Sequence, residues 1–473
     1  MGAGTSAAQA PFAGDHRAAT GVDPLVPDGQ SAARRQGLEL GAILGKTIAH
    51  FFPDLFGWLG EVRDKRDQDL ITYGRRFLLW MGLMGFLLKL GSRRRLRFEL
   101  DTPEALANLN VLSRCQQEKV AHSDTLNYFL GRVPAASLPL LRRKMVQRLI
   151  RMKALDHGRL MGHFLVVVDG SGQLRFNQRH CPHCLEQVHG EQTLYFHNVL
   201  EAKLVTPEGL AISLESEFIE NADPKASKQD CEMKAFARLA ERLKKNYPQL
   251  LLCLCFDALY ANGTVMDLCR KNHWKYFITF KEGSLPALWQ EYQSLLPLCP
   301  RNRKAHTTAE GAHQTFAWVE QLEHVDDRKR HHRVNAFQCQ EKLNGETRFF
   351  AWLTNFSIRS DNVAALGNRG GRCRWKIENE GFNLQKNSGF NLEHAYSTGQ
   401  LQIKNFYVLL QIAHLILQLV ERGSLLTRNA KQLFGSLANL AKRLAESIRN
   451  VPIPADTMDP ELAGKIQIRF NTS

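Results

Sequence analysis

Two short, uninterrupted apolar runs dominate the middle of the chain, and each ends on an aspartate. Residues 164–168 precede Asp169, and residues 250–256 precede Asp257. Continuous apolar runs of this length are typical of strands that are buried on both faces of a sheet. The pattern therefore predicts two core strands that end at Asp169 and Asp257 and deliver both carboxylates to one edge of the sheet.

The neighbouring segments complete the pattern of a mixed sheet. Further strands are predicted at 194–204, 209–218 and 275–280, and helices at 226–246 and 262–271. The resulting order of strand, strand, strand, helix, strand, helix, strand is that of a ribonuclease-H-like sheet. We therefore expect an α/β fold, a ribonuclease-H-like mixed sheet with flanking helices.

A second group of strand patterns lies later in the chain, at 314–322, 334–340 and 347–355. They predict a β-rich insertion that interrupts the sheet domain. The chain before the sheet is helical instead, and at 140–155 its apolar residues form one stripe with arginines around it. The predicted division is a disordered tail (1–40), an all-α basic DNA-binding domain (41–158), a catalytic domain in two parts (159–283 and 369–422), the β-rich insertion (284–368) and a basic helical tail (423–473).

Residues 372–386 have polar positions at helical spacing, and the glycine-rich stretch 367–371 leads into them. Arg374, Glu378 and Gln385 would fall within about one face of a helix. A carboxylate with a guanidinium one turn earlier suits a metal ion beside a phosphate, although such pairs are also common on solvated surfaces. Glu380 lies two residues after Glu378, roughly 200° away on a helix, so one of the two can face the aspartates, and the spacing favours Glu378.

Two aspartates at a sheet edge and a glutamate on a late helix form the layout of a two-metal phosphoryl-transfer site. Hard ions such as Mg²⁺ or Mn²⁺ prefer carboxylate oxygens, so Asp169, Asp257 and Glu378 would suffice to hold two ions. We expect Asp169 to bridge both ions, Asp257 to bind one and Glu378 the other.

These pieces resemble the bacterial insertion-sequence DDE transposases, whose last acidic residue lies in a Tyr-Arg-Glu-Lys signature helix. The matching pieces are Asp169-Gly170-Ser171, Asp257 after its strand, Trp352-Leu353-Thr354-Asn355, and Arg374-Trp375-x-Ile377-Glu378. The likeness covers about residues 160–420. The tyrosine of the signature would fall on Gly371 and its lysine on Gln385, with Lys386 one step late.

The resemblance implies an enzyme that binds the ends of a mobile element, cleaves them and joins them to target DNA as a homodimer on paired ends. The formal net charge of +15 and the pI near 9.4 favour a polyanionic partner such as double-stranded DNA. The candidate DNA contacts are Arg93, Arg94, Arg95, Arg142, Arg143, Arg374 and Lys386. An ordinary basic helical bundle is the alternative interpretation of the front domain.

Ten scattered cysteines, some inside apolar strands, suggest reduced thiols in a cytoplasmic, nucleoid-associated protein. The apolar run at 77–88 is too short to span a bilayer. Cys181 and Cys184 form a Cys-x-x-Cys that suits half of a structural zinc site, which His197 or Cys231 could complete, or they are reduced cysteines packed against a loop.

Two other functions share part of this pattern. A ribonuclease-H-like nuclease or resolvase would use the same triad without the insertion. An inactive DNA-binding derivative would keep the basic helices and lose carboxylates, whereas this chain retains all three.

Overall fold

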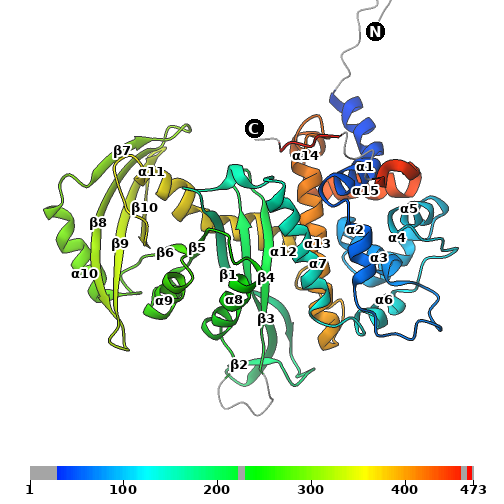
Figure 1. The fold of residues 1–473 in the computed structure, drawn as a ribbon, viewed down its shortest axis with the longest axis horizontal. Coiled ribbons are helices and arrows are strands. Elements are labelled where there is room, and N and C mark those ends of the chain that lie inside the picture. The colour runs from blue at the N-terminus through cyan, green and yellow to red at the C-terminus, as the bar shows by residue number, and fades with distance from the viewer. Residues whose placement is uncertain (1–28, 222–228, 460–465, 471–473) are drawn as a thin grey trace, which may run out of the picture.

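The computed structural model describes residues 29–221, 229–459 and 466–470, which form a mixed α/β fold. The ten strands in these residues make one mostly antiparallel sheet, in the order β2-β3-β1-β5-β6-β10-β9-β8-β7, with β4 paired to β3. The sheet extends from the centre to one end of an elongated molecule, and a body of helices occupies the other end (Figure 1).

The centre of the sheet contains the predicted elements in the predicted order, together with one strand, β2, that was not predicted. β1 is antiparallel to β3, β3 is antiparallel to β4, and β1, β5 and β6 run parallel. The bounds are β1 (Phe164–Phe176), β2 (Leu185–His189), β3 (Gln192–Val205), β4 (Ala211–Ile219), α8 (Glu232–Asn246), β5 (Leu252–Phe256), α9 (Gly263–Lys271) and β6 (Lys275–Thr279). Residues 226–228 of the predicted first helix lie outside the described residues.

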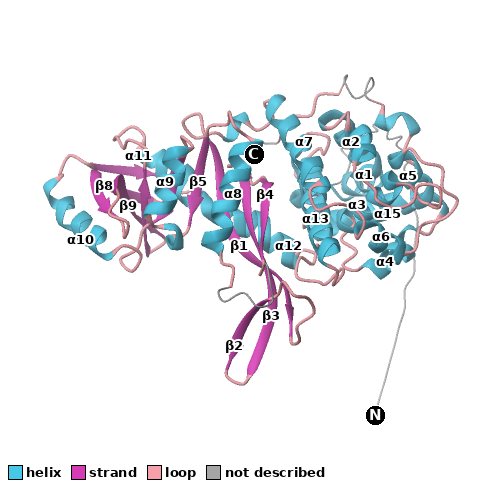
Figure 2. Cartoon of the chain, turned by 60° about the horizontal axis from the view of Figure 1, so that its bottom comes forward, coloured by secondary structure: helices cyan, strands magenta, loops and turns pink. Residues whose placement is uncertain are grey.

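The two apolar runs form buried strands, as predicted. Residues 164–168 of β1 and the whole of β5 are buried. The prediction that the first strand ends at Asp169 is wrong, because β1 continues to Phe176 along β3. This extension forms a long antiparallel ribbon with β2 and β3 that projects from the body of the protein (Figure 2).

The strands predicted for the insertion extend the central sheet. β10 pairs antiparallel with β6 through Leu353 and Ile278, and β9, β8 and β7 follow outward. The elements are α10 (Pro286–Leu295), β7 (Arg303–Thr307), β8 (His313–Val325), β9 (His331–Leu343) and β10 (Glu346–Thr354). The three predicted strands are confirmed, while α10 and β7 were not predicted.

Between residue 29 and the sheet, the structure has seven α-helices: α1 (Gly29–Phe51), α2 (Leu55–Glu61), α3 (Arg75–Leu87), α4 (Arg93–Leu100), α5 (Pro103–Ser113), α6 (Ser123–Leu130) and α7 (Ser137–Arg151). The apolar run at 77–88 is the buried helix α3, as expected. Residues 29–40 belong to α1, so the predicted tail 1–40 is too long; residues 1–28 lie outside the described residues.

The helix α13 (Gln400–Arg422) lies between the sheet and the front helices (Figure 1). It is long and apolar enough to cross a membrane, but 94% of its most apolar window is buried within the protein. Asn405 on this helix donates to the carbonyl oxygens of Leu130 (2.9 Å) and Val133 (2.8 Å). The helix therefore joins the two halves of the molecule.

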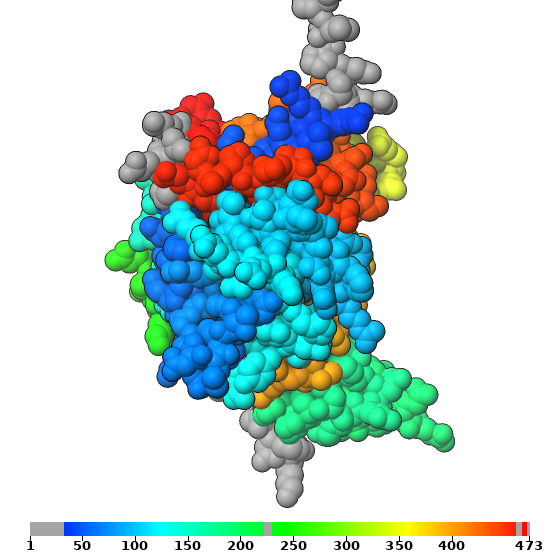
Figure 3. All heavy atoms as spheres, turned by 90° about the vertical axis from the view of Figure 1, so that its right-hand side faces the viewer, coloured from blue at the N-terminus to red at the C-terminus, as the bar shows by residue number. Residues whose placement is uncertain are grey.

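The end of the chain folds back on its beginning. The predicted C-terminal helix is two helices, α14 (Ala430–Phe434) and α15 (Leu437–Asn450), interrupted at Gly435. Asn108 of α5 donates to the carbonyl oxygens of Ile448 and Val451, both at 2.8 Å. Figure 3 shows α15 (orange-red) lying against α1 (blue), so the apolar face of α15 is used inside the chain.

Candidate active site

Asp169 and Asp257 lie at matching positions on neighbouring parallel strands. Val167 of β1 pairs with Cys255 of β5. Asp169 lies two residues after Val167 (169 − 167), and Asp257 lies two residues after Cys255 (257 − 255). β5 ends at Phe256, whereas β1 continues along β3. The two side chains therefore lie where the parallel pair of strands opens, at one edge of the β1–β5 pairing.

The two carboxylates interact electrostatically. Burial raises the pKa of Asp169 to about 6, the Arg374 guanidinium opposes this increase, and the charges of Asp257 and Glu232 add to it. The Oδ1 atom of Asp257 accepts a hydrogen bond from the backbone N–H of Leu259 at 2.9 Å, so this residue also caps a turn. Several carboxylates close together with one cation beside them leave a local excess of negative charge, which favours a bound divalent cation.

Glu232 is an acidic neighbour that the sequence patterns did not reveal. It is in the first turn of α8, where its carboxylate packs over Gly170 so closely that a Cβ at that glycine would overlap it. Burial raises the pKa of Glu232, the charge of Asp257 raises it further, and the Tyr260 hydroxyl lies 3.4 Å away. A glutamate at the start of a helix is common, so no local pattern singles it out.

The signature segment is an irregular helix. It begins with α11 (Val363–Ala365) and continues through π-helical turns at Leu366–Gly370, a 3-10 turn at Gly371–Arg374, further π turns at Ile377–Asn383 and the short α12 (Leu384–Asn387). Its glycines allow close packing on the sheet: a Cβ on Gly371 would overlap the Trp352 indole, and one on Gly370 would overlap the Phe277 ring. A tyrosine has no room at position 371 for the same reason.

The segment places its predicted polar residues in different surroundings. Arg374 Nη1 lies 3.6 Å from Asp169 Oδ2, whereas Glu378 is exposed. Gln385 is fully buried, and its Nε2 atom lies 2.9 Å from both Gln411 Oε1 and His414 Nδ1. The expectation that Arg374, Glu378 and Gln385 share one face is wrong, because π and 3-10 turns change the number of residues per turn.

Two further residues of the segment have local partners. Lys386 forms an ion pair with Glu393 at 2.9 Å. Glu380 lies beside Gly209 in the turn between β3 and β4. Burial raises the pKa of Glu421, and the charge of Glu380 raises it further. Glu378 is exposed and Glu380 is half-buried, so the two side chains differ in their exposure.

The predicted DNA contact of Arg142 is wrong. Its side chain is 2% exposed, and Nη1 donates to the hydroxyls of Ser213 (2.7 Å) and Ser216 (2.6 Å) in β4. This guanidinium joins α7 to the sheet and is not accessible to a phosphate. The neighbouring Arg143 is half-buried and bonds to Asn246 at the end of α8.

The other basic candidates lie at the start of α4. Arg94 is exposed, Arg95 pairs with Glu99 one turn later at 2.9 Å, and Arg93 pairs with Asp124 at 3.2 Å. Arg93 and Arg94, but not Arg95, border a hollow of about 770 Å³ lined by Ser92, Arg93, Arg94, Arg97, Phe98, His122, Ser123, Asp124, His394, Ala395 and Tyr396. Three arginines and the exposed Phe98 face this hollow.

The closest group of potential metal ligands lies outside the Asp169–Asp257 site. Within residues 29–221, 229–459 and 466–470, three or more cysteine, histidine or acidic ligand atoms come within 4.8 Å of one another in one group, which comprises His180, Cys181, Cys184 and His197. The predicted pair of Cys181 and Cys184 is in this group, and Cys231 is not. The acidic residues near Asp169 are spaced more widely.

No protein-family model matches this chain, and no curated protein matches it. A cryo-EM structure of a piggyBac transposase synaptic complex with hairpin DNA is similar to it with a TM-score of 0.38 and 9% sequence identity, over 89% of this chain and 81% of that chain.

Proposed function

We propose that this chain is an insertion-sequence transposase of the DDE type, which cleaves and joins DNA strands by two-metal phosphoryl transfer. The observation that carries the proposal is the pair of Asp169 and Asp257 at matching positions on parallel strands, with Arg374 beside it. The strand order β4-β3-β1-β5-β6, three antiparallel strands followed by two parallel ones, supports a ribonuclease-H-like sheet.

The residues at this edge fit hard divalent cations. Their donors are carboxylate oxygens, and the pKa of Asp169 and that of Glu232 are both raised, because these side chains are partly buried and close to other acids. When bound, two such ions would activate the attacking oxygen and stabilise the leaving oxygen of a phosphodiester. Asp169 and Asp257 would hold them.

The third carboxylate is assigned to Glu378, on the segment that brings Arg374 to Asp169. Glu232 is the additional candidate, because its charge raises the pKa of Asp169 and the charge of Asp257 raises the pKa of Glu232. We propose that Glu232 takes part in the same carboxylate cluster, and that Glu380, directed toward Gly209, does not.

Arg374 and the basic hollow would position the DNA. The Arg374 guanidinium is close enough to Asp169 to contact a phosphate that approaches the carboxylates, and Lys386 lies twelve positions later on the same segment (386 − 374). Arg93, Arg94 and Arg97, which border the hollow, would contact backbone phosphates of the element end. Joining two ends concertedly needs two active sites, so we propose a homodimer on paired ends.

The test is an assay of DNA cleavage and joining. Purified protein with Mg²⁺ is incubated with duplexes from both flanks of the gene and with a supercoiled target plasmid. We expect nicking at the element ends followed by strand-transfer products. Cleavage without joining would indicate a ribonuclease-H-like nuclease, and DNA binding with neither reaction would indicate an inactive DNA-binding derivative.

A further inference from the structure

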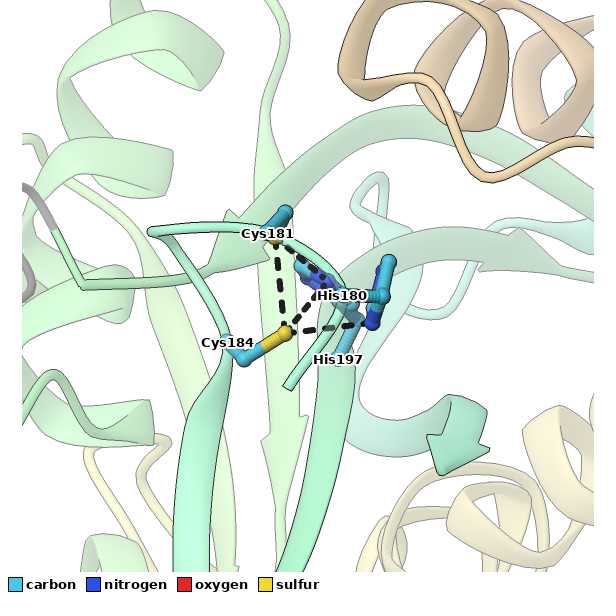
Figure 4. A group of neighbouring side chains, drawn as sticks. All are labelled: His180, Cys181, Cys184 and His197. Atoms are coloured by element: carbon cyan, nitrogen blue, oxygen red, sulfur yellow. Dashed lines mark hydrogen bonds between the residues drawn. The ribbon is translucent and has the colours of Figure 1, made fainter. Parts of the chain in front are cut away.

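We propose that His180, Cys181, Cys184 and His197 bind one Zn²⁺ ion. The first three residues lie in the connection between β1 and β2, and His197 comes from β3 (Figure 4). Cys184 and His197 are buried, while His180 and Cys181 are half-buried. Two thiolates and two imidazoles are the donor set of many structural zinc sites.

The distances between the ligand atoms fit a tetrahedral ion. Cys181 Sγ lies 3.4 Å from Cys184 Sγ and 3.4 Å from His197 Nε2, and Cys184 Sγ lies 3.3 Å from His180 Nδ1 and 3.6 Å from His197 Nε2. Tetrahedral zinc with Zn–S of about 2.3 Å and Zn–N of about 2.05 Å separates a sulfur from a nitrogen by about 3.5 Å and two sulfurs by about 3.8 Å. The side chains are therefore already arranged around a central position.

Neither a disulfide nor simple hydrogen bonding accounts for the cluster as well as a metal ion does. The two sulfurs at 3.4 Å are not joined by a disulfide, whose S–S bond is about 2.05 Å. Thiols are weak hydrogen-bond donors, so thiol–imidazole contacts alone give little reason for four such side chains to meet. Four protein ligands also leave no open position for a substrate, which is typical of a structural and not a catalytic zinc.

The surrounding contacts hold the ligands in place. Asn221, just after β4, donates from Nδ2 to the Cys184 carbonyl oxygen at 3.0 Å, and its backbone N–H donates to His183 O at 3.1 Å. The His180 ring packs on Phe176 with 3.9 Å between ring centroids. The ion would join the end of β1, the start of β2 and the middle of β3, and so fix the base of the projecting ribbon.

The test is metal analysis of the full chain purified without chelator. We expect one zinc per chain by mass spectrometry, and less than a tenth of that in the C181S/C184S double variant. The matched control is Cys231→Ser, an exposed cysteine outside the cluster, which should keep the full zinc content. Zinc retained by the double variant, or absent from the folded wild type, would overturn the proposal.

A second measurement does not depend on the variant being folded. Wild-type protein loaded with Co²⁺ should show the visible absorption of a tetrahedral site and the near-ultraviolet band of cobalt–thiolate bonds. Octahedral cobalt without a thiolate band, or a Cys181–Cys184 disulfide found by mass spectrometry in freshly purified protein, would contradict a zinc site. Neither measurement depends on DNA cleavage, so failure here leaves the proposed function to its own assay.

Discussion

Arg374 places its guanidinium 3.6 Å from the carboxylate of Asp169, and so connects the irregular signature segment to the first strand of the sheet. The pairing opposes the increase in the pKa of Asp169 that burial and the neighbouring acids cause. It also brings a cation to the place where a phosphate would meet the carboxylates. The sequence spacing predicts a different partner for Arg374, namely Glu378 one helical turn later.

The first prediction concerns this arginine. Arg374→Gln should lower single-turnover DNA cleavage at pH 8 about 100-fold, as loss of one preorganised donor does elsewhere. Binding of Mn²⁺ should not weaken, because the change removes a positive charge near the ions. Weaker Mn²⁺ binding with unchanged cleavage at saturating metal would show that Arg374 acts on the metal site alone.

The second prediction follows from the pKa of Asp169. The folded-state pKa of about 6 lies above the ordinary value of 3.8, so the stabilisation from protonated Asp169 is complete below pH 3.8 and lost as the pH rises through 6. Asparagine at this position does not ionise, so the Asp169→Asn variant does not lose this stabilisation as the pH rises. In metal-free buffer at pH 8, Asp169→Asn should therefore raise the free energy of unfolding by up to about 3 kcal/mol, a gain that disappears near pH 4.

Urea denaturation across this pH range measures the effect. The control is Asp361→Asn, whose side chain is 69% exposed, and which should show no comparable dependence on pH. An Asp169→Asn variant that is less stable than the wild type at pH 8 would show that Arg374 outweighs burial at this site.

The third prediction separates the glutamates. Glu378→Gln and Glu232→Gln should each abolish Mg²⁺-dependent cleavage, and Glu380→Gln should retain it. An active Glu378 variant beside an inactive Glu232 variant would assign the third ligand to α8. An inactive Glu380 variant would contradict the orientation of that side chain toward Gly209.

The fourth prediction separates surface from buried arginines. Arg94→Ser should weaken binding to duplex DNA and reduce the slope of log K against log salt by about one. Arg142→Gln should instead lower the free energy of unfolding by about 3–5 kcal/mol, since it removes the buried cation near Glu215. Full-length variants are needed because α13 and α15 complete the front helical body. Equal salt slopes for the wild type and Arg94→Ser would show that DNA does not bind to the surface around Arg94.

The apolar runs predicted the strands well because burial on both faces needs no knowledge of distant contacts. β5 and the first half of β1 follow directly from them, and with them the two aspartates. The signature segment was predicted less well, since helical spacing assumes regular turns, and close packing of Gly370 and Gly371 on the sheet replaces these with π and 3-10 turns.

Distant partners account for the remaining differences. Arg142 seemed part of a basic surface because its partners, Ser213 and Ser216, are on a strand about seventy residues later. Gln385 stands where the resemblance puts a lysine, and a second ammonium there would be buried near Lys203, whose Nζ donates to Gln411 at 3.1 Å. Glu232 and His197 reach their clusters through the fold, which a local pattern does not reveal.

We propose that Asp169 and Asp257 hold the catalytic ions, and a Mn²⁺ titration at pH 8 measures this binding without requiring DNA cleavage. The protein is first loaded with one zinc ion per chain and freed of excess zinc, and bound Mn²⁺ is counted by electron paramagnetic resonance for the wild type, Asp169→Asn, Asp257→Asn and the exposed control Asp361→Asn. We predict binding by the wild type and the control and its loss in both site variants. Unchanged Mn²⁺ binding by either site variant would contradict the claim.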